Sequence, residues 1–119
     1  MADNLLITVS KQFAVDTIRL RESIRSRGRA IAVVNQLLRS GTSIGANIHE
    51  GNYASSKADF INKFQIALKE CYETDYWLGV FSEAGIISKE EYDSALSRCS
   101  KIRTLLIASI TTAKKNADQ

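Results

Sequence analysis

Residues 37–51 read Leu37-Leu-Arg-Ser-Gly-Thr-Ser-Ile-Gly-Ala-Asn-Ile-His-Glu-Gly51, and this stretch decides how the rest of the chain can be arranged. Leu37, Gly41, Ile44 and Ile48 recur at steps of four and three, the spacing that places residues on one face of an α-helix. In the interior of this segment, Gly41, Gly45 and several Ser, Thr and Asn residues lower the helix propensity. We therefore expect close packing against neighbouring helices to compensate.

The same helical period extends in both directions and predicts four helices. The first runs from about Asn4 to Ser26 and ends at Gly28, and the second runs from Ala30 to Gly51, where a glycine in the left-handed conformation would close it. The apolar stripes of these two helices comprise Leu6, Val9, Phe13, Leu20 and Ile24, and then Ala30, Val33, Val34, Leu37, Gly41, Ile44 and Ile48.

Two capping boxes predict where the remaining helices begin. Ser56 is followed three residues later by Asp59, and Ser88 by Glu91, which is the spacing of reciprocal N-terminal caps. Gly85 ends the third helix. The apolar stripes comprise Phe60, Phe64, Ala67, Cys71, Leu78 and Phe81 in the third helix, and Tyr92, Ala95, Cys99, Ile102, Leu106, Ile110 and Ala113 in the fourth.

Length and composition agree with one all-α domain. The chain has 119 residues, no proline and six glycines, which is too few turn residues for a loop-rich β-sandwich. Helices of this length joined by short turns lie antiparallel, so we expect residues 1–119 to form a single up-down-up-down four-helix bundle. With no signal-peptide pattern and no apolar run near 20 residues, we expect a cytoplasmic protein without a membrane partner.

The third helix carries a second apolar stripe that one bundle core does not cover. Two interpretations remain open, a thick core that buries broad helix faces and an interface between copies of the chain. We favour the interface, because Tyr and Trp are enriched where proteins associate. The candidate interface residues are Ile61, Leu68, Tyr72, Tyr76 and Trp77.

The stretch 37–51, followed by Lys57, Phe60, the pair Ala67 and Leu68, and Glu70, resembles the bacterial four helix bundle protein family, also called the 23S rRNA intervening-sequence or S23-type family. The resemblance implies a bundle assembled as a ring-like homopentamer. Some members are encoded inside intervening sequences of large-subunit ribosomal RNA genes, and related bundles are accessory proteins of diversity-generating retroelements, so the resemblance implies nucleic-acid binding. No enzymatic activity is established for the family. The motif residues are Arg39, Ser40, Ser43, Ile44, Ala46, Asn47, Ile48, Glu50 and Gly51.

The chain departs from this family's pattern at two places. Many members have a Phe-Pro pair and a glutamate between the first two helices, where this chain has residues 25–29 and no proline. Members commonly have alanine at the position of His49, so the resemblance implies no general role for that histidine.

The residue inventory offers no catalytic, metal or cofactor site. A single His49 and two distant cysteines lack the spacing of a metal site. Cys71 and Cys99 fall on core stripes, which is typical of buried, unreactive thiols, and whether they touch is open.

An arginine cluster at the end of the first helix is the one candidate ligand site. The net charge is only +3, but residues 1–49 carry seven basic and three acidic residues, whereas residues 50–97 carry four and nine. Arginine donates paired hydrogen bonds to phosphate. Two alternatives to a phosphate ligand remain open: the cations favour the helix dipole, or the acidic third turn, with Glu83, Glu90, Glu91 and Asp93, neutralises them. The cluster comprises Arg19, Arg21, Arg25, Arg27 and Arg29, and the candidate nucleic-acid contacts are Arg21, Arg25, Arg27 and Arg29, with Arg39 from the polar face of the second helix.

We therefore expect a non-enzymatic homo-oligomer, a pentamer by resemblance, that binds RNA or DNA through backbone phosphates. The alternative is a scaffold or accessory subunit that holds a protein partner without contacting nucleic acid directly.

Overall fold

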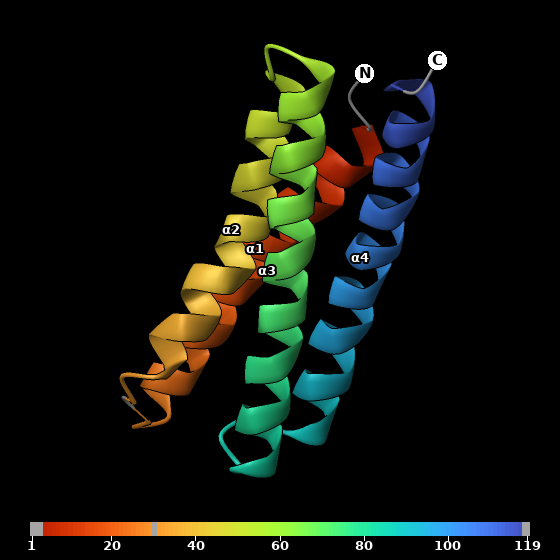
Figure 1. Ribbon diagram of the computed structural model, residues 1–119. Coiled ribbons are helices and arrows are strands. Elements are labelled where there is room, and N and C mark those ends of the chain that lie inside the picture. The colour runs from red at the N-terminus through yellow and green to blue at the C-terminus, as the bar shows by residue number, and fades with distance from the viewer. Residues whose placement is uncertain (1–3, 30, 118–119) are drawn as a thin grey trace.

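Four α-helices form the structure. The computed structural model describes residues 4–29 and 31–117, in which the helices are α1 (Asn4–Ser26), α2 (Val34–Asn52), α3 (Lys57–Glu83) and α4 (Lys89–Ala117). They alternate in direction along an elongated body of 53 × 20 × 20 Å (Figure 1). The described residues contain no strand, so the predicted all-α, up-down-up-down bundle is confirmed.

Two glycines end helices in the left-handed conformation. Gly28 has a φ of 79° and Gly85 a φ of 73°, values that favour glycine because it has no Cβ. Gly85 N–H donates to the Ser82 carbonyl and Ile86 N–H to the Phe81 carbonyl, the paired bonds of a Schellman motif. Each turn therefore reverses the chain within a few residues, and the next helix packs alongside.

The predicted caps open α3 and α4. Ser56 Oγ accepts a hydrogen bond from Asp59 N–H at 3.1 Å. At α4 the box is reciprocal, because Ser88 Oγ accepts from Glu91 N–H at 3.0 Å and Glu91 Oε1 accepts from Ser88 N–H at 2.8 Å.

The second helix differs from the expectation at both ends. It begins at Val34, after a turn that leaves Val33 39% exposed rather than on the buried stripe, while Ala30 lies outside the described residues. It ends at Asn52, and Gly51 is not among the glycines with a positive φ, so the predicted left-handed closure at Gly51 is wrong. Gly51 is needed for another reason, a close approach to α3.

The glycines of α2 allow the neighbouring helices to approach closely, as the low helix propensity of this segment suggested. A Cβ on Gly41 would lie 2.8 Å from both Cγ2 and Oγ1 of Thr17 on α1, and one on Gly45 would lie 3.1 Å from the carbonyl oxygen of Ser10. On the other side, a Cβ on Gly51 would lie 2.7 Å from the Phe64 ring of α3. The prediction that Gly41 and Gly45 are packing positions is confirmed.

The core consists of two buried clusters, one toward each end. The first comprises Leu6, Phe13, Ile44, Ile48, Phe64, Ala67, Cys71, Cys99, Ile102, Leu106 and Ile110. The second comprises Ile24, Val34, Leu37, Leu78, Phe81, Ile86, Ile87 and Ala95. The predicted stripes supply nearly all of both clusters, apart from Ile86 and Ile87 in the turn between α3 and α4.

The helices pack in the order of the chain. α2 packs extensively against α1 and α3, and α3 against α4, whereas α1 and α4 touch least, and in the described residues the backbones of the diagonal pairs do not approach closely. A cavity of about 290 Å³ lies in the seam between α1 and α4, with Phe13 and Leu20 on one side and Ala95 on the other. Among the described residues, no helix has both the length and the apolar character to cross a membrane.

Candidate nucleic-acid interface

The end of α1 presents three arginines to one cavity. Arg21 and Arg25 are four residues apart and so share a face of α1, and the Gly28 turn brings Arg29 beside the start of α2. Two hydrogen bonds fix this turn, from Gly28 N–H to the Arg25 carbonyl at 3.0 Å and from Arg29 N–H to the Ile24 carbonyl at 3.2 Å. The cavity of about 250 Å³ is lined by Arg21, Arg25, Arg29, Ile31, Ala32, Val34 and Asn35.

The arginines of the cluster differ in how far they are neutralised. Arg27 reaches the first turn of α4, where its two terminal nitrogens lie 3.3 and 3.0 Å from the Glu91 carboxylate oxygens. Arg21 lies 2.7 Å from its neighbour Glu22. Within the described part of the chain, Arg25, Arg29 and Arg19 have no carboxylate partner. The acidic turn therefore neutralises one of the five arginines, and α1's own Glu22 neutralises another in part.

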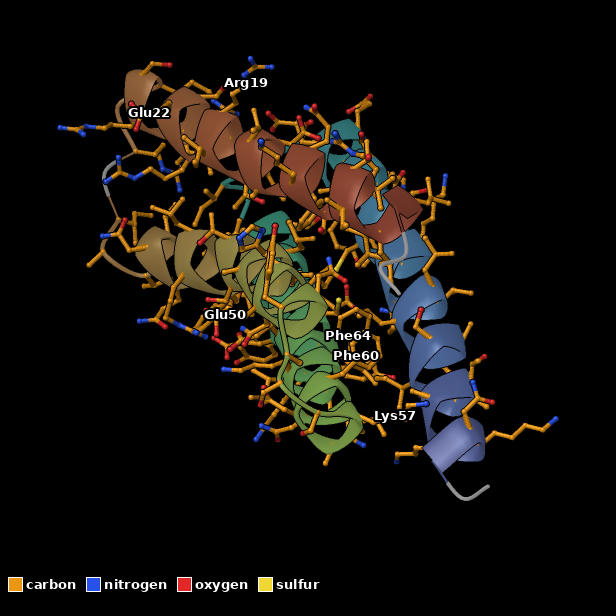
Figure 2. The ribbon with its side chains drawn as sticks, turned by 90° about the horizontal axis from the view of Figure 1, so that it is seen from above. Arg19, Glu22, Glu50, Lys57, Phe60 and Phe64 are labelled. Atoms are coloured by element: carbon orange, nitrogen blue, oxygen red, sulfur yellow. The ribbon has the colours of Figure 1, made fainter. Side chains whose placement is uncertain are left out.

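Arg19 and Glu22 lie on the far end of α1 from the α2–α3 connection (Figure 2). Arg19 is exposed, and its side chain points away from the bundle. It does not line the cavity between α1 and α2, so the cluster divides into three cavity arginines, Arg27 paired with Glu91, and the outward-facing Arg19.

Arg39 is engaged elsewhere. Its guanidinium contacts Glu70 at 3.2 Å and Glu73 at 2.5 Å, both on α3, and Trp77 Nε1 donates to the same Glu73 oxygen at 3.1 Å. The hydrogen bond from Arg39, followed by that from Trp77, lowers the pKa of Glu73 below its ordinary value. The two carboxylates offset the charge of the Arg39 guanidinium and occupy its terminal nitrogens, which sets Arg39 apart from the other candidate contacts.

Other motif residues in the stretch 37–51 also bind α2 to its neighbours. Ser40 Oγ lies 3.0 Å from Thr74 Oγ1 in a fully buried contact. Glu50 accepts a hydrogen bond from Lys63 Nζ at 2.8 Å. Ser43 Oγ donates to the Arg39 carbonyl within α2, while Ala46 is exposed. The motif therefore acts mainly as a clamp between helices, and Ile44, Ile48 and Gly51 complete its buried side.

The second stripe of α3 divides between core and surface. Leu68 packs against the first core cluster and Trp77 against the second, while Ile61 is half-buried. Tyr72 and Tyr76 remain 54% and 62% exposed. The thick core is therefore observed for Leu68 and Trp77, whereas an interface between copies at the two exposed tyrosines stays a prediction.

A cation flanks the exposed tyrosines. The Arg103 guanidinium of α4 lies 5.5 Å from the centre of the Tyr72 ring and also forms an ion pair with Asp75. Ile107, one turn further along α4, is 44% exposed. Together Tyr72, Tyr76, Arg103 and Ile107 form a surface of aromatic, aliphatic and cationic character, which we call the tyrosine face.

The two cysteines meet across α3 and α4. Cys99 Sγ lies 3.6 Å from the Cys71 carbonyl oxygen, both thiols are free, and both are buried. The neighbouring Cys71 thiol, followed by burial, raises the pKa of the Cys99 thiol. His49 is exposed and its ring lies 5.2 Å from that of Tyr53. Among the described residues, no group of three or more His, Cys, Asp or Glu side chains could hold a metal ion.

The engagement of Arg39 with Glu70 and Glu73 is a feature that reasoning from the sequence missed. A usable signal was present, because the connection between α2 and α3 is short. Antiparallel helices joined by such a connection pair residues at equal distances from it, and Arg39 and Glu73 lie at comparable distances on either side.

Comparisons with known proteins agree with this architecture. The family model described as 23S rRNA-intervening sequence protein matches residues 3–108. A crystal structure from Bacteroides thetaiotaomicron, described as a protein with unknown function from the S23 ribosomal protein family, is 43% identical. The similarity covers 93% of this chain and 99% of that one, with a TM-score of 0.90. No curated protein matches the sequence.

Proposed function

Since this chain belongs to the 23S rRNA-intervening sequence protein family, we propose that it is a non-enzymatic, homo-oligomeric bundle that binds RNA or DNA through backbone phosphates. The observation that carries the proposal is the end of α1, where Arg25 and Arg29 have no carboxylate partner within the described chain and share a cavity with Arg21. Guanidinium groups match phosphate oxygens with paired donors, and they carry no information about bases.

We call the end of α1 that carries Arg21, Arg25 and Arg29 the arginine end. It should recognise the charge of a nucleic acid rather than its base sequence. The described residues that line its cavity include no aromatic side chain on which a base could stack. Arg27 contributes less than Arg25 and Arg29 because Glu91 holds it, and Arg39 contributes least. Binding is therefore expected to be weak for one copy and nearly independent of sequence.

Self-association is the second part of the proposal. The tyrosine face has the composition of an interface, since Tyr and Arg are enriched at such surfaces. We propose that copies of the chain meet there and form a ring, a pentamer by analogy with the family. Repetition of the arginine end around a ring would supply several weak contacts at once, and so gain avidity.

The non-enzymatic part of the proposal rests on how the nucleophilic groups are held. The Cys99 thiol is buried with a raised pKa, which disfavours the reactive thiolate, and buried free thiols suit a reducing cytoplasm. His49 packs against Tyr53 at the surface.

Nucleic-acid binding is tested by fluorescence anisotropy with labelled single-stranded RNA and DNA of 20 nucleotides at 50 and 200 mM salt. The triple variant Arg25→Gln, Arg27→Gln, Arg29→Gln is compared with wild type. The matched control, Lys101→Gln, Lys114→Gln, Lys115→Gln, removes the same charge from exposed residues of α4. Between 50 and 200 mM salt, the affinity of wild type for a single strand should fall by up to about 20-fold more than that of the arginine variant, the limit set by three full phosphate contacts. Equal binding by wild type and the arginine variant would refute the arginine end as the interface.

A protein-interaction scaffold is the second candidate function, and the tyrosine face favours it. Light scattering on the variant Tyr72→Glu, Tyr76→Glu tests whether this face joins copies of the chain. A wild-type mass near 13.2 kDa at micromolar concentration would refute self-association. If wild type is an oligomer that binds no nucleic acid even at 50 mM salt, the scaffold replaces the nucleic-acid proposal.

A further inference from the structure

The cavity between α1 and α2 has features that distinguish it from a merely basic surface. Three guanidiniums contribute to its lining, and no carboxylate of the described residues does. Its remaining walls are Ile31, Ala32, Val34 and Asn35, three aliphatic side chains and one neutral amide. The concave shape concentrates positive charge that would otherwise be spread along a helix.

The start of α2 adds donors to the same place. Val34 and Asn35 donate their N–H groups back to the Ile31 and Ala32 carbonyls, which satisfies the first turn internally. Ahead of them, the N–H groups of Ala32 and Val33 donate no hydrogen bond within the described part of the chain, and Val33 provides no side-chain cap. Unused N–H groups and the positive end of the helix dipole both favour an anion.

We propose that this cavity binds the terminal phosphate of a nucleic-acid strand, in preference to the phosphodiesters between nucleotides. This proposal rests on the proposed function and specifies which phosphate the arginine end recognises. Arg25 and Arg29 are the main contacts, and Arg21 is a weaker one because Glu22 competes for it.

Charge favours a terminal phosphate. A phosphate monoester carries about −1.5 to −2 charges at neutral pH and offers three free acceptor oxygens. A backbone phosphodiester carries a single charge and has two of its oxygens bound to sugars. Several guanidiniums and free N–H groups around one cavity suit the group with the greater charge and more acceptors.

Size supports the same choice. The cavity volume of about 250 Å³ is below the roughly 300–1,000 Å³ of sites that enclose a drug-sized ligand. The cavity therefore suits a phosphate group with little of its attached sugar, rather than a whole nucleotide.

The test compares labelled 12-nucleotide single-stranded RNAs of one sequence that carry a 5′-phosphate, a 3′-phosphate or hydroxyls at both ends, at 150 mM salt. We expect one of the two phosphorylated strands to bind wild type roughly tenfold more tightly than the hydroxyl strand. The variant Arg25→Gln, Arg29→Gln should lose this preference. The matched control Lys11→Gln, Arg19→Gln removes two exposed, unpaired charges from the same helix outside the cavity and should keep it. The strand that shows the preference identifies which end is recognised.

Three further results would bear on the proposal. Equal binding of all three strands by wild type, or a preference that persists in Arg25→Gln, Arg29→Gln, would overturn the terminal-phosphate cavity and leave the proposed function intact. If no strand binds even at 50 mM salt, the proposed function fails, and a titration with inorganic phosphate decides the cavity separately. Phosphate-induced shifts of the Ala32 and Asn35 amide resonances in wild type but not in Arg25→Gln, Arg29→Gln would then support the cavity as a phosphate site. The absence of such shifts in wild type would refute the cavity as a phosphate site.

Discussion

Replacement of Gly41 by alanine should destabilise the protein, although alanine is the better helix former. The added methyl would lie 2.8 Å from both Cγ2 and Oγ1 of Thr17. These two atoms occupy two of the three staggered positions on the threonine Cβ, and both face the methyl. Because any rotamer of threonine fills at least one of these two positions, rotation cannot relieve the contact. The hydrogen bond from Thr17 Oγ1 to the Phe13 carbonyl at 2.8 Å would also be lost on rotation.

Gly79 provides a matched control within the same protein. It lies in the interior of α3, and a Cβ built on it meets nothing within 4 Å. Both substitutions gain about 0.8–1 kcal/mol of helix propensity, so the difference between them isolates the packing cost at Gly41. Overpacking of a tight contact typically costs about 1–3 kcal/mol. The Gly79→Ala variant should therefore gain about 1 kcal/mol in unfolding free energy over wild type. The unfolding free energy of Gly41→Ala should be about 1–3 kcal/mol lower than that of Gly79→Ala.

The assays are urea and thermal unfolding followed by circular dichroism, at one protein concentration because association adds to stability. At about 4 °C per kcal/mol for a domain of this size, the melting temperatures of the two variants should differ by roughly 4–12 °C. Equal stabilisation of Gly41→Ala and Gly79→Ala would refute the reasoning, because it would mean that α1 does not press on α2 at Gly41.

Three further predictions concern charged side chains. The hydrogen bond from Ser88 N–H lowers the pKa of Glu91 below its ordinary 4.5. The ionised carboxylate therefore stabilises the fold above pH 4.5, and this stabilisation is lost as the pH falls through the lowered pKa of the folded state. The difference in unfolding free energy between wild type and Glu91→Gln should shrink from pH 7 to pH 3, and a constant difference would contradict this. Trp77, the one tryptophan of the chain, should report protonation of Glu73 by fluorescence with a midpoint below 4.5, and Arg39→Gln should raise that midpoint. Glu22→Gln should tighten nucleic-acid binding by releasing its neighbouring arginine, and weaker binding would count against the arginine end.

The sequence allowed most of the fold to be predicted, because local signals there agree with one another. Gly28, Gly85, Ser56 and Ser88 each end or begin a helix where predicted, since turn and cap chemistry depend on a few adjacent residues. The start of α2 was misplaced, because the apolar side chains of residues 31–33 continue the helical period although the chain there forms a turn. Hydrophobic spacing alone does not distinguish a turn with apolar side chains from the first turn of a helix.

The candidate site was predicted in part. The arginine cluster does lie at an exposed end, but its division into held and free cations depends on contacts between helices. Arg27 reaches Glu91 across 64 residues of sequence, and Arg39 reaches Glu73 across 34. Tyr72 and Tyr76 share one stripe by spacing and Trp77 lies on another sector of α3, but spacing does not show that Trp77 is covered by the second core cluster while the tyrosines stay exposed. Such pairings follow from the register between helices, which periodicity within one helix does not specify.

The thin seam between α1 and α4 has a consequence for how the molecule forms and opens. Every extensive packing contact joins helices that follow one another in sequence, so the chain closes only short loops until the seam itself is made. Folding should accordingly be fast, with the closure of α1 onto α4 as its most distant event. In the native state, fluctuations that part these two helices sacrifice the least buried surface. Amide hydrogens of α2 and α3 should therefore exchange with solvent last, and those facing the seam should exchange earlier through partial opening rather than global unfolding.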